Sequence, residues 1–253
     1  MRLPHPLYGL YERRLAASLP KDGLPRHVGV ILDGNRRWAR SMGESTRHGH
    51  QAGADKIADL LEWSEDIGVE VVTLWMLSTD NLARSADELE QLLGIIEDAV
   101  AALAATGRWR IQAVGALELL PDQTVKALVA AQDATAGVTG LHVNVAVGYG
   151  GRKEIADAVK SFLREHADAG SSLDELAEAF DVEHIAEHLY TKGQPDPELV
   201  IRTSGEQRLG GFLLWQSATS EFYFCEAYWP DFRRVDFLRA VRAYAARERR
   251  GGR

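Results

Sequence analysis

Short apolar segments alternate along this chain with longer segments of helical periodicity. The apolar segments are nearly continuous runs rich in Val, Ile and Leu, whereas a strand with one face in water alternates polar and apolar residues. Strands buried on both faces are typical of a parallel sheet covered by helices. We therefore predict a single α/β domain with a central, mostly parallel sheet of about six strands wrapped by helices. The predicted strands are residues 28–32, 69–77, 109–115, 141–147, 199–201 and 222–224.

Helical segments are predicted between and after these strands. Ser85 and Glu88 have the spacing of a capping box, and Pro121 stands where proline opens a helix. No repeat of 20–50 residues and no linker divides the chain. We therefore expect one main domain over residues 27–253, preceded by a helix and linker over residues 1–26. The predicted helices of the main domain are residues 50–67, 85–105, 121–136, 152–169, 173–179, 182–189 and 235–248.

The N-terminal segment carries apolar residues at helical spacing. Such a helix packs on the body of the protein or on a second subunit, or its apolar face contacts a membrane surface. Arg13 and Arg14 accompany the apolar face and keep a peripheral membrane contact open as an alternative. The apolar positions are Leu7, Leu10, Tyr11, Leu15 and Leu19.

Composition limits the partners and the compartment. A net charge of −8 argues against a nucleic-acid partner, because such a protein normally presents a basic face. The single cysteine, Cys225, excludes an internal disulfide and a cysteine-rich metal site. We find no signal peptide and no run of about 20 apolar residues, so we expect a cytoplasmic protein, with membrane association as the alternative.

The first predicted strand ends in Asp33, followed by Gly34, Asn35, Arg36 and Arg37. Open α/β sheets bind ligands beyond the carboxyl ends of their strands, and a helix that begins there attracts anions. A carboxylate among such groups would repel a phosphate unless a divalent cation lay between them. This segment therefore predicts a Mg²⁺–diphosphate site.

Polar residues also follow three further strands. Arginine offers paired donors to phosphate oxygens, so Arg202 and Arg208 around a glycine-containing loop suit a diphosphate. Because these loops lie at equivalent ends of one predicted sheet, we expect them to share a pocket. The three loops are residues 78–84, 148–152 and 202–208.

Three short motifs allow other chemistry. Residues 148–151 resemble part of a dinucleotide-binding loop but lack its G-x-G-x-x-G spacing. His184 and His188 match the H-x-x-E-H pattern of a zinc-protease class, although a solvated helix explains the pair better. His48 and His50 could ligate a metal, but we favour His50 as a donor to an anion or as a helix cap.

Taken in order, the motifs resemble those of the cis-prenyltransferases, the family that includes undecaprenyl diphosphate synthases, and in particular its actinobacterial short-chain members. The resemblance implies a homodimer and a Mg²⁺-dependent condensation of isopentenyl diphosphate with an allylic diphosphate, which forms a cis double bond and releases diphosphate. It extends over nearly all of residues 27–250. The matching segments are residues 27–38, 78–81, 144–152, 196–206, 212–216, 221–224 and 229–232.

Individual roles follow from the same resemblance. Asp33 and Glu221 would be the metal-associated acids, with Gly34, Asn35 and Arg37 around the allylic diphosphate and Trp38 beside it. Ser78 and Asn81 would assist proton removal, and Arg202 and Arg208 would hold isopentenyl diphosphate. Arg250, in the sequence Arg-Gly-Gly, would reach the partner subunit's site. Further substrate-binding positions are Arg36, His50, Thr79, Asp80, Arg84, Leu209 and Gly210.

The resemblance also bears on product length. Met76 stands where long-chain members carry alanine, and a bulky side chain in a packed wall stops elongation early. We therefore expect a short product such as Z,E-farnesyl diphosphate. A long-chain (decaprenyl or undecaprenyl) diphosphate synthase and a non-catalytic, prenyl-binding partner subunit are the alternatives. Thr46 replaces an expected arginine, for which Arg47 could substitute, and Gln207 replaces a common histidine.

Overall fold

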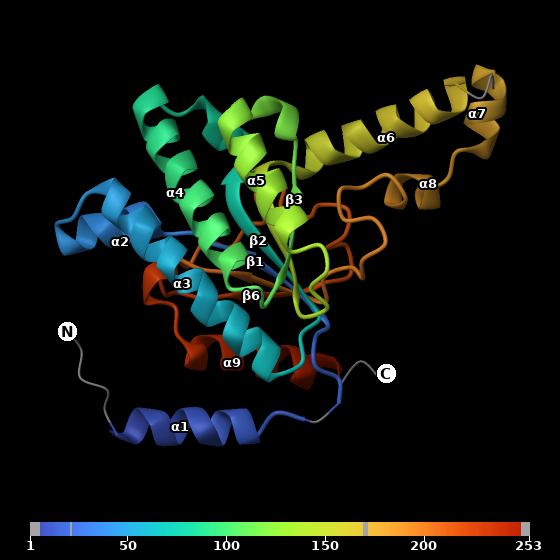
Figure 1. Cartoon of the computed structure of the whole chain (residues 1–253). Coiled ribbons are helices and arrows are strands. Elements are labelled where there is room, and N and C mark those ends of the chain that lie inside the picture. Colours follow the sequence, from blue (N-terminus) through green and yellow to red (C-terminus); the bar gives the residue numbers. More distant parts are fainter. Residues whose placement is uncertain (1–5, 21, 169–171, 249–253) are drawn as a thin grey trace.

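The computed structural model describes residues 6–20, 22–168 and 172–248 and contains a six-stranded sheet. The strand order is β3-β4-β2-β1-β5-β6, and every pair of neighbours is parallel. The predicted parallel α/β sheet is therefore confirmed (Figure 1). The strands are β1 (His27–Ile31), β2 (Val71–Ser78), β3 (Arg110–Val114), β4 (His142–Tyr149), β5 (Leu199–Arg202) and β6 (Glu221–Phe224).

The described helices agree closely with the predicted ones, with one addition. Residues 35–42 form a separate short helix, α2, before the long helix that follows it. The α-helices are α1 (Pro6–Ala17), α2 (Asn35–Met42), α3 (Thr46–Asp66), α4 (Ala86–Ala105), α5 (Asp122–Ala134), α6 (Gly151–Asp168), α7 (Leu173–Ala179), α8 (Val182–Ala186) and α9 (Arg234–Glu248). Short 3₁₀ turns are η1 (Thr79–Ala83), η2 (Leu117–Leu119) and η3 (Trp229–Asp231).

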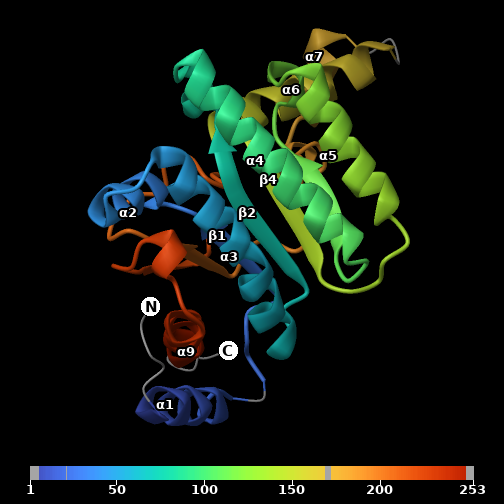
Figure 2. The ribbon, with the colours of Figure 1, turned by 60° about the vertical axis from the view of Figure 1, so that its left-hand side comes forward.

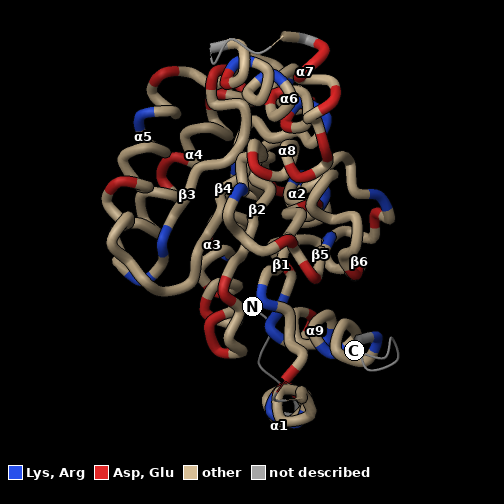
Figure 3. Tube along the Cα trace, turned by 90° about the vertical axis from the view of Figure 1, so that its right-hand side faces the viewer, with Lys and Arg blue, Asp and Glu red and all other residues tan. Residues whose placement is uncertain are grey.

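Helices cover one face of the sheet, and irregular chain covers much of the other. The larger apolar core joins the strands to Leu60 of α3, Ile96 of α4, Leu128 of α5 and Val241 of α9. On the opposite face Phe212 and neighbouring residues of the loop after β5 fill a smaller core. Helix α6 runs outward from the sheet, α7 lies at its far end, and α8 packs alongside the outer half of α6 (Figures 1 and 3).

Helix α1 lies against α9, as the packing alternative predicts (Figure 2). Leu15 is 2% exposed and packs with Val235 and Leu238. Leu10 and Tyr11 remain exposed on the same helix. Among the described residues, no helix is long and apolar enough to cross a membrane.

A buried polar network holds the central strands in register. The His27 ring bonds through Nδ1 to the Pro195 carbonyl at 2.7 Å and through Nε2 to Thr73 Oγ1 at 2.8 Å. Asn144 donates to the same hydroxyl at 2.9 Å. Burial lowers the pKa of His27 to about 4, because the charged ring would lose its hydration. His27 is therefore neutral in the folded protein at pH 7.

Candidate active site

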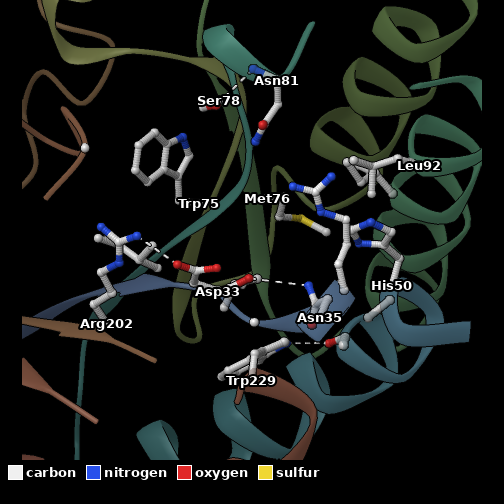
Figure 4. Close-up of a pocket in the computed structure, with 18 of the residues that line it drawn as sticks. Asp33, Asn35, His50, Trp75, Met76, Ser78, Asn81, Leu92, Arg202 and Trp229 are labelled. Atoms are coloured by element: carbon white, nitrogen blue, oxygen red, sulfur yellow. Dashed lines mark hydrogen bonds and ion pairs between the residues drawn. The ribbon is translucent and has the colours of Figure 1, made fainter. Parts of the chain in front are cut away.

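A cavity of about 610 Å³ opens at the carboxyl edge of the sheet (Figure 4). Its mouth is polar, with loops after β1 and β5 and the start of α2, while α3, α4 and the end of β2 contribute apolar side chains. The predicted shared pocket therefore exists at the expected edge of the sheet, but only three of the four predicted loops line it, and residues 148–152 do not. Of the predicted site residues, those lining it are Asp33, Gly34, Asn35, Arg36, Arg37, His50, Met76, Ser78, Asp80, Asn81, Arg84, Arg202, Arg208 and Gly210.

Asp33 is held between two arginines. Its Oδ2 accepts a hydrogen bond from Arg202 Nη2 at 2.8 Å, and its Oδ1 accepts one from Arg37 Nη2 at 3.3 Å. Partial burial alone would raise the pKa of Asp33. The hydrogen bond and charge of Arg202, the charge of Arg37 and a hydrogen bond with Ser204 outweigh this effect and lower the pKa. The carboxylate is therefore ionised at neutral pH.

Glycines set the position of the loop that follows Asp33. Gly34 has φ 106°, and a Cβ there would lie 2.7 Å from the Tyr228 ring. Gly49 and Gly53, one turn apart on α3, face Asn35, and a Cβ on either would lie within 2.4 Å of an Asn35 oxygen. Only residues without side chains allow α2 to approach α3 this closely.

The arginines form a connected basic group around the mouth of the cavity. Arg37 donates to Ser204 Oγ at 2.7 Å and to Glu206 Oε1 at 3.1 Å. Glu206 also pairs with Arg208 at 3.4 Å, and Arg202 donates to the Arg208 carbonyl oxygen. These guanidinium groups come from α2, β5 and the loop after β5, so they can surround a diphosphate from several sides.

A second polar group lies at the end of β2. Ser78 Oγ accepts a hydrogen bond from the Asn81 backbone N–H at 3.2 Å. The Asn81 side-chain oxygen accepts from Arg84 at 3.1 and 3.2 Å, and Arg84 pairs with Glu88 at 3.0 Å. Glu88 pairs in addition with Arg36 at 3.4 Å. This chain of contacts links Asn81 to α4 and α2 and fixes its side chain near Ser78 (Figure 4).

Several polar atoms in the cavity wall have no hydrogen-bond partner within the protein. They include Asn35 Oδ1, His50 Nε2 and Arg202 Nε, all buried. Burial first, and then the charge of Arg84, lowers the pKa of His50 to about 4, so its ring is neutral. Buried polar groups are normally paired, so these three atoms leave hydrogen-bonding capacity unused in residues that line the cavity.

The apolar part of the cavity was not predicted in detail from the sequence. Met76 lies in its wall as expected, together with side chains from α3 and α4. Their helical spacing could have indicated a common face, but not that this face borders a cavity. The additional lining residues include Ala54, Ile57, Leu92, Ile95, Ile96, Trp75, Glu206 and Trp229.

Some predicted site residues lie elsewhere. Trp38 stacks on His48 with ring centroids 5.7 Å apart and is absent from the cavity lining. Leu209 packs into the smaller apolar core, and Thr79 lies against Gly150. Arg250 and the two glycines after it lie outside the described residues.

Glu221 is not brought to Asp33, because it begins β6 at the amino edge of the sheet. It is level with Leu199 of β5 and therefore with Val28 of β1, five residues before Asp33. At about 3.3 Å per residue this separates the two acids by roughly 16 Å along the strands. Glu221 instead pairs with Arg247. Asp33 and Glu221 therefore lie apart within one chain, and the metal-associated role expected of Glu221 stays a prediction.

The other candidate motifs are engaged in local contacts. His184 accepts from the Asp181 backbone N–H, and His188 contacts the His184 carbonyl and Glu165. Within the described ranges, no cluster of three histidine, cysteine or acidic residues could hold a metal ion. In the glycine-rich loop after β4, the Gly151 N–H donates to the Gly211 carbonyl at 2.8 Å, so it is already paired.

The site therefore defines an enzyme that binds phosphate groups at a basic mouth and a hydrocarbon in an apolar interior. Residues 31–252 match the family model described as putative undecaprenyl diphosphate synthase. The chain belongs to the undecaprenyl diphosphate synthase family of cis-prenyltransferases.

Individual relatives are similar over nearly their whole length. The (2Z,6E)-farnesyl diphosphate synthase of Thermobifida fusca is 62% identical over 98% of this chain and 97% of that protein. The short-chain Z-isoprenyl diphosphate synthase of Mycobacterium bovis is 54% identical over 100% of this chain and 98% of that protein. The crystal structure of lavandulyl diphosphate synthase from Lavandula x intermedia, in complex with dimethylallyl diphosphate, has a TM-score of 0.81 at 33% identity, covering 88% of this chain and 95% of that one.

Proposed function

We propose that this prenyltransferase condenses isopentenyl diphosphate with an allylic diphosphate and releases a short Z-prenyl diphosphate, such as Z,E-farnesyl diphosphate. The observation that carries the proposal is the cavity itself, in which a group of arginines around one carboxylate opens onto an apolar chamber with Met76 in its wall. The printed names of the relatives from Thermobifida and Mycobacterium support the short product.

The two polar groups give the substrates separate places. Asn35 and Arg37 would hold the allylic diphosphate beside Asp33, and Arg202 and Arg208 would hold isopentenyl diphosphate. During the reaction the allylic C1–O bond breaks and its electron pair leaves on diphosphate. The π electrons of isopentenyl diphosphate form the new bond from its C4. Arginines fixed where charge develops on the leaving group stabilise it without reorganisation.

The proton lost from C2 of isopentenyl diphosphate needs an acceptor close to the end of β2. Ser78 already accepts a hydrogen bond from the chain at Asn81, so its own hydroxyl hydrogen is available to a substrate phosphate oxygen. Through this contact Ser78 would orient that phosphate oxygen to take the proton, while Asn81 would contact the same substrate. Arg84 keeps the Asn81 amide in place.

We infer that Mg²⁺ is the cofactor, with Asp33 as its protein ligand. Mg²⁺ is commonly bound by one or two carboxylates, several waters and substrate phosphates, so the Asp33 carboxylate beside a diphosphate site suits it. When bound, the ion would neutralise charge on the departing diphosphate. Asp33 is ionised and placed at the mouth of the cavity, as such a ligand must be.

We infer a homodimer from the exposed edge of the sheet. Strand β6 is the last of the sheet, and Phe224 on it and Leu214 in the preceding loop are both exposed. Uncovered sheet edges and apolar patches are commonly closed by another copy of the chain. Light scattering after gel filtration would report a dimer mass if this is correct.

The buried thiol of Cys225 supports a cytoplasmic location, since the reducing cytoplasm leaves thiols unpaired. A peripheral membrane contact would use the exposed Leu10 and Tyr11 of α1, flanked by Arg13 and Arg14. Sedimentation with anionic vesicles would test this contact, and loss of binding in Leu10→Ser would support it.

The decisive experiment is product analysis. The purified protein is incubated with Mg²⁺, isopentenyl diphosphate and, separately, dimethylallyl, geranyl or farnesyl diphosphate, and the products are separated by chain length. A product of about three isoprene units supports the proposal, whereas ten or more units identifies a long-chain synthase. Absence of diphosphate release with every primer would favour a non-catalytic partner subunit, although the presence of Asp33, Arg37, Arg202 and Arg208 argues for an enzyme.

A further inference from the structure

Trp75 lines the cavity but has no role in the proposed reaction described above. The β2–β4 pairing shifts register between Trp75 and Leu77, so Met76 is an extra residue opposite β4. Bulges of this kind re-aim side chains and are common beside active sites. Here Trp75 and Met76, which are neighbours in the chain, both line the same cavity.

The indole is fixed by contacts on several sides. It stacks on Phe212 with centroids 5.2 Å apart and planes 15° apart, and it meets Tyr149 edge-on at 6.4 Å. Its Nε1–H donates to the Tyr149 carbonyl oxygen at 3.3 Å. A Cβ on Gly210 would lie 3.3 Å from the ring. The side chain is nevertheless only partly buried, because part of it borders the cavity.

Trp75 on β2 lies two strands away from Arg202 on β5, with β1 between them. Arg202 is level with Ile31, and Ile31 is level with Trp75, so the three residues cross β5, β1 and β2 in one row. Residues level with each other in a parallel sheet project to the same face, and two strand spacings are about 9.6 Å. Figure 4 shows Arg202 and Trp75 on the same side of β2, so a five-carbon chain that extended along this row from a diphosphate on Arg202 would reach the indole.

We propose that the face of Trp75 contacts the carbon skeleton of isopentenyl diphosphate and stabilises the positive charge that develops on it. The inference rests on the proposed function. When the C3=C4 π electrons of isopentenyl diphosphate bond to the allylic carbon, C3 becomes electron-deficient until the C2 proton leaves and the new double bond closes. An aromatic face attracts such a cation, and the attraction is strongest away from water. Ser78, three residues further along the chain, lines the same cavity and is the residue proposed to orient the phosphate oxygen that takes this proton.

The test distinguishes an effect of the ring's π electrons on kcat from an effect of its size. Trp75→Phe keeps an aromatic face, and Trp75→Leu fills space without one. Phenylalanine and pentafluorophenylalanine, introduced at position 75 by amber suppression, have nearly the same shape, but the fluorinated ring has lost its negative face. Trp63→Leu is the matched control, because Trp63 packs on Phe232 and Phe237 and is absent from the cavity lining.

We expect kcat to fall about 30-fold in Trp75→Leu and by a similar factor for pentafluorophenylalanine relative to phenylalanine, as an attraction of about 2 kcal/mol requires. The KM values for both substrates, the thermal midpoint and the kcat of Trp63→Leu should change little. Equal kcat for phenylalanine and pentafluorophenylalanine would overturn the proposal, and so would an effect confined to KM. If Trp75→Leu does not fold, the comparison of phenylalanine with pentafluorophenylalanine at position 75 still tests the proposal. If the wild-type protein makes no prenyl product at all, the proposed function fails instead.

Discussion

The carboxylate of Asp33 and the guanidinium of Arg202 meet at 2.8 Å across the carboxyl edge of the sheet, although 169 positions separate them in the chain. Parallel pairing of β1 with β5 makes this contact, because it sets Ile31 level with Arg202. The contact joins the acid expected to hold Mg²⁺ to an arginine expected to hold a substrate. On these expected roles, the binding of isopentenyl diphosphate would be coupled through this pair to the ionisation of the allylic diphosphate.

Replacing Asp33 with Asn should abolish most activity without unfolding the protein. The amide cannot provide a charged ligand for Mg²⁺, and loss of such electrostatic stabilisation costs at least about 100-fold in kcat. The measurement is the rate of diphosphate release as a function of Mg²⁺ concentration, with the thermal midpoint as a check on folding. Normal turnover in this variant would contradict the role assigned to Asp33.

Met76→Ala should lengthen the product, because removal of the side chain extends the apolar chamber between α3 and α4. Product chain length by reversed-phase chromatography is the measurement. Met42→Ala is the control, since Met42 is 62% exposed, and its products should match the wild type. An unchanged product distribution in folded Met76→Ala would show that another part of the wall limits elongation.

Gly49→Ala should destabilise the protein and weaken substrate binding together. The new Cβ would lie 2.3 Å from the Asn35 carbonyl oxygen, so α2 must shift, at a cost of about 3 kcal/mol. Urea unfolding gives the stability, and the KM for the allylic diphosphate reports the position of Asn35. Gly94→Ala is the control: nothing lies within 4 Å of its Cβ, and stability there should rise by about 0.5–1 kcal/mol.

Stability should fall as the pH drops below about 6.5. The pKa of His27 is about 4 in the folded protein against 6.5 for a free histidine, so the unfolded chain binds a proton that the folded chain does not. The stability contributed by the neutral ring is complete above the unfolded pKa. It is lost progressively toward pH 4, by about 3 kcal/mol at most. Urea midpoints across this range measure the effect. His27→Asn should make the decline smaller and leave the part due to His50, whose pKa is also about 4.

The fold could be predicted from the sequence because hydrophobic periodicity is a local property. Strands such as Val71–Ser78 are mostly apolar, and the helices between the strands have recognisable boundaries. The division between α2 and α3 was missed because it depends on Gly43, which ends α2 in a left-handed conformation.

The site was only partly predictable. Residues that directly follow strands, such as Asp33 and Ser78, were placed correctly because strand ends converge in a parallel sheet. Glu221 lies away from Asp33 within the chain, which its motif could not reveal, because a motif does not show which end of its strand faces the pocket. The inner wall, including Ile57 and Ile96, depends on how α3 and α4 pack, which no single segment of the sequence encodes.

The position of the cavity at the end of β2 has a consequence for how such enzymes can diversify. Trp75 and Met76 lie on opposite sides of β2 and pack against different apolar cores, as consecutive residues of a strand do (Figure 4). Because both residues line the cavity, two consecutive positions have access to the same space. A mutation at the first would alter the speed of bond formation, and a mutation at the second would alter how far the chain grows. Selection could thus tune rate and product separately through adjacent codons.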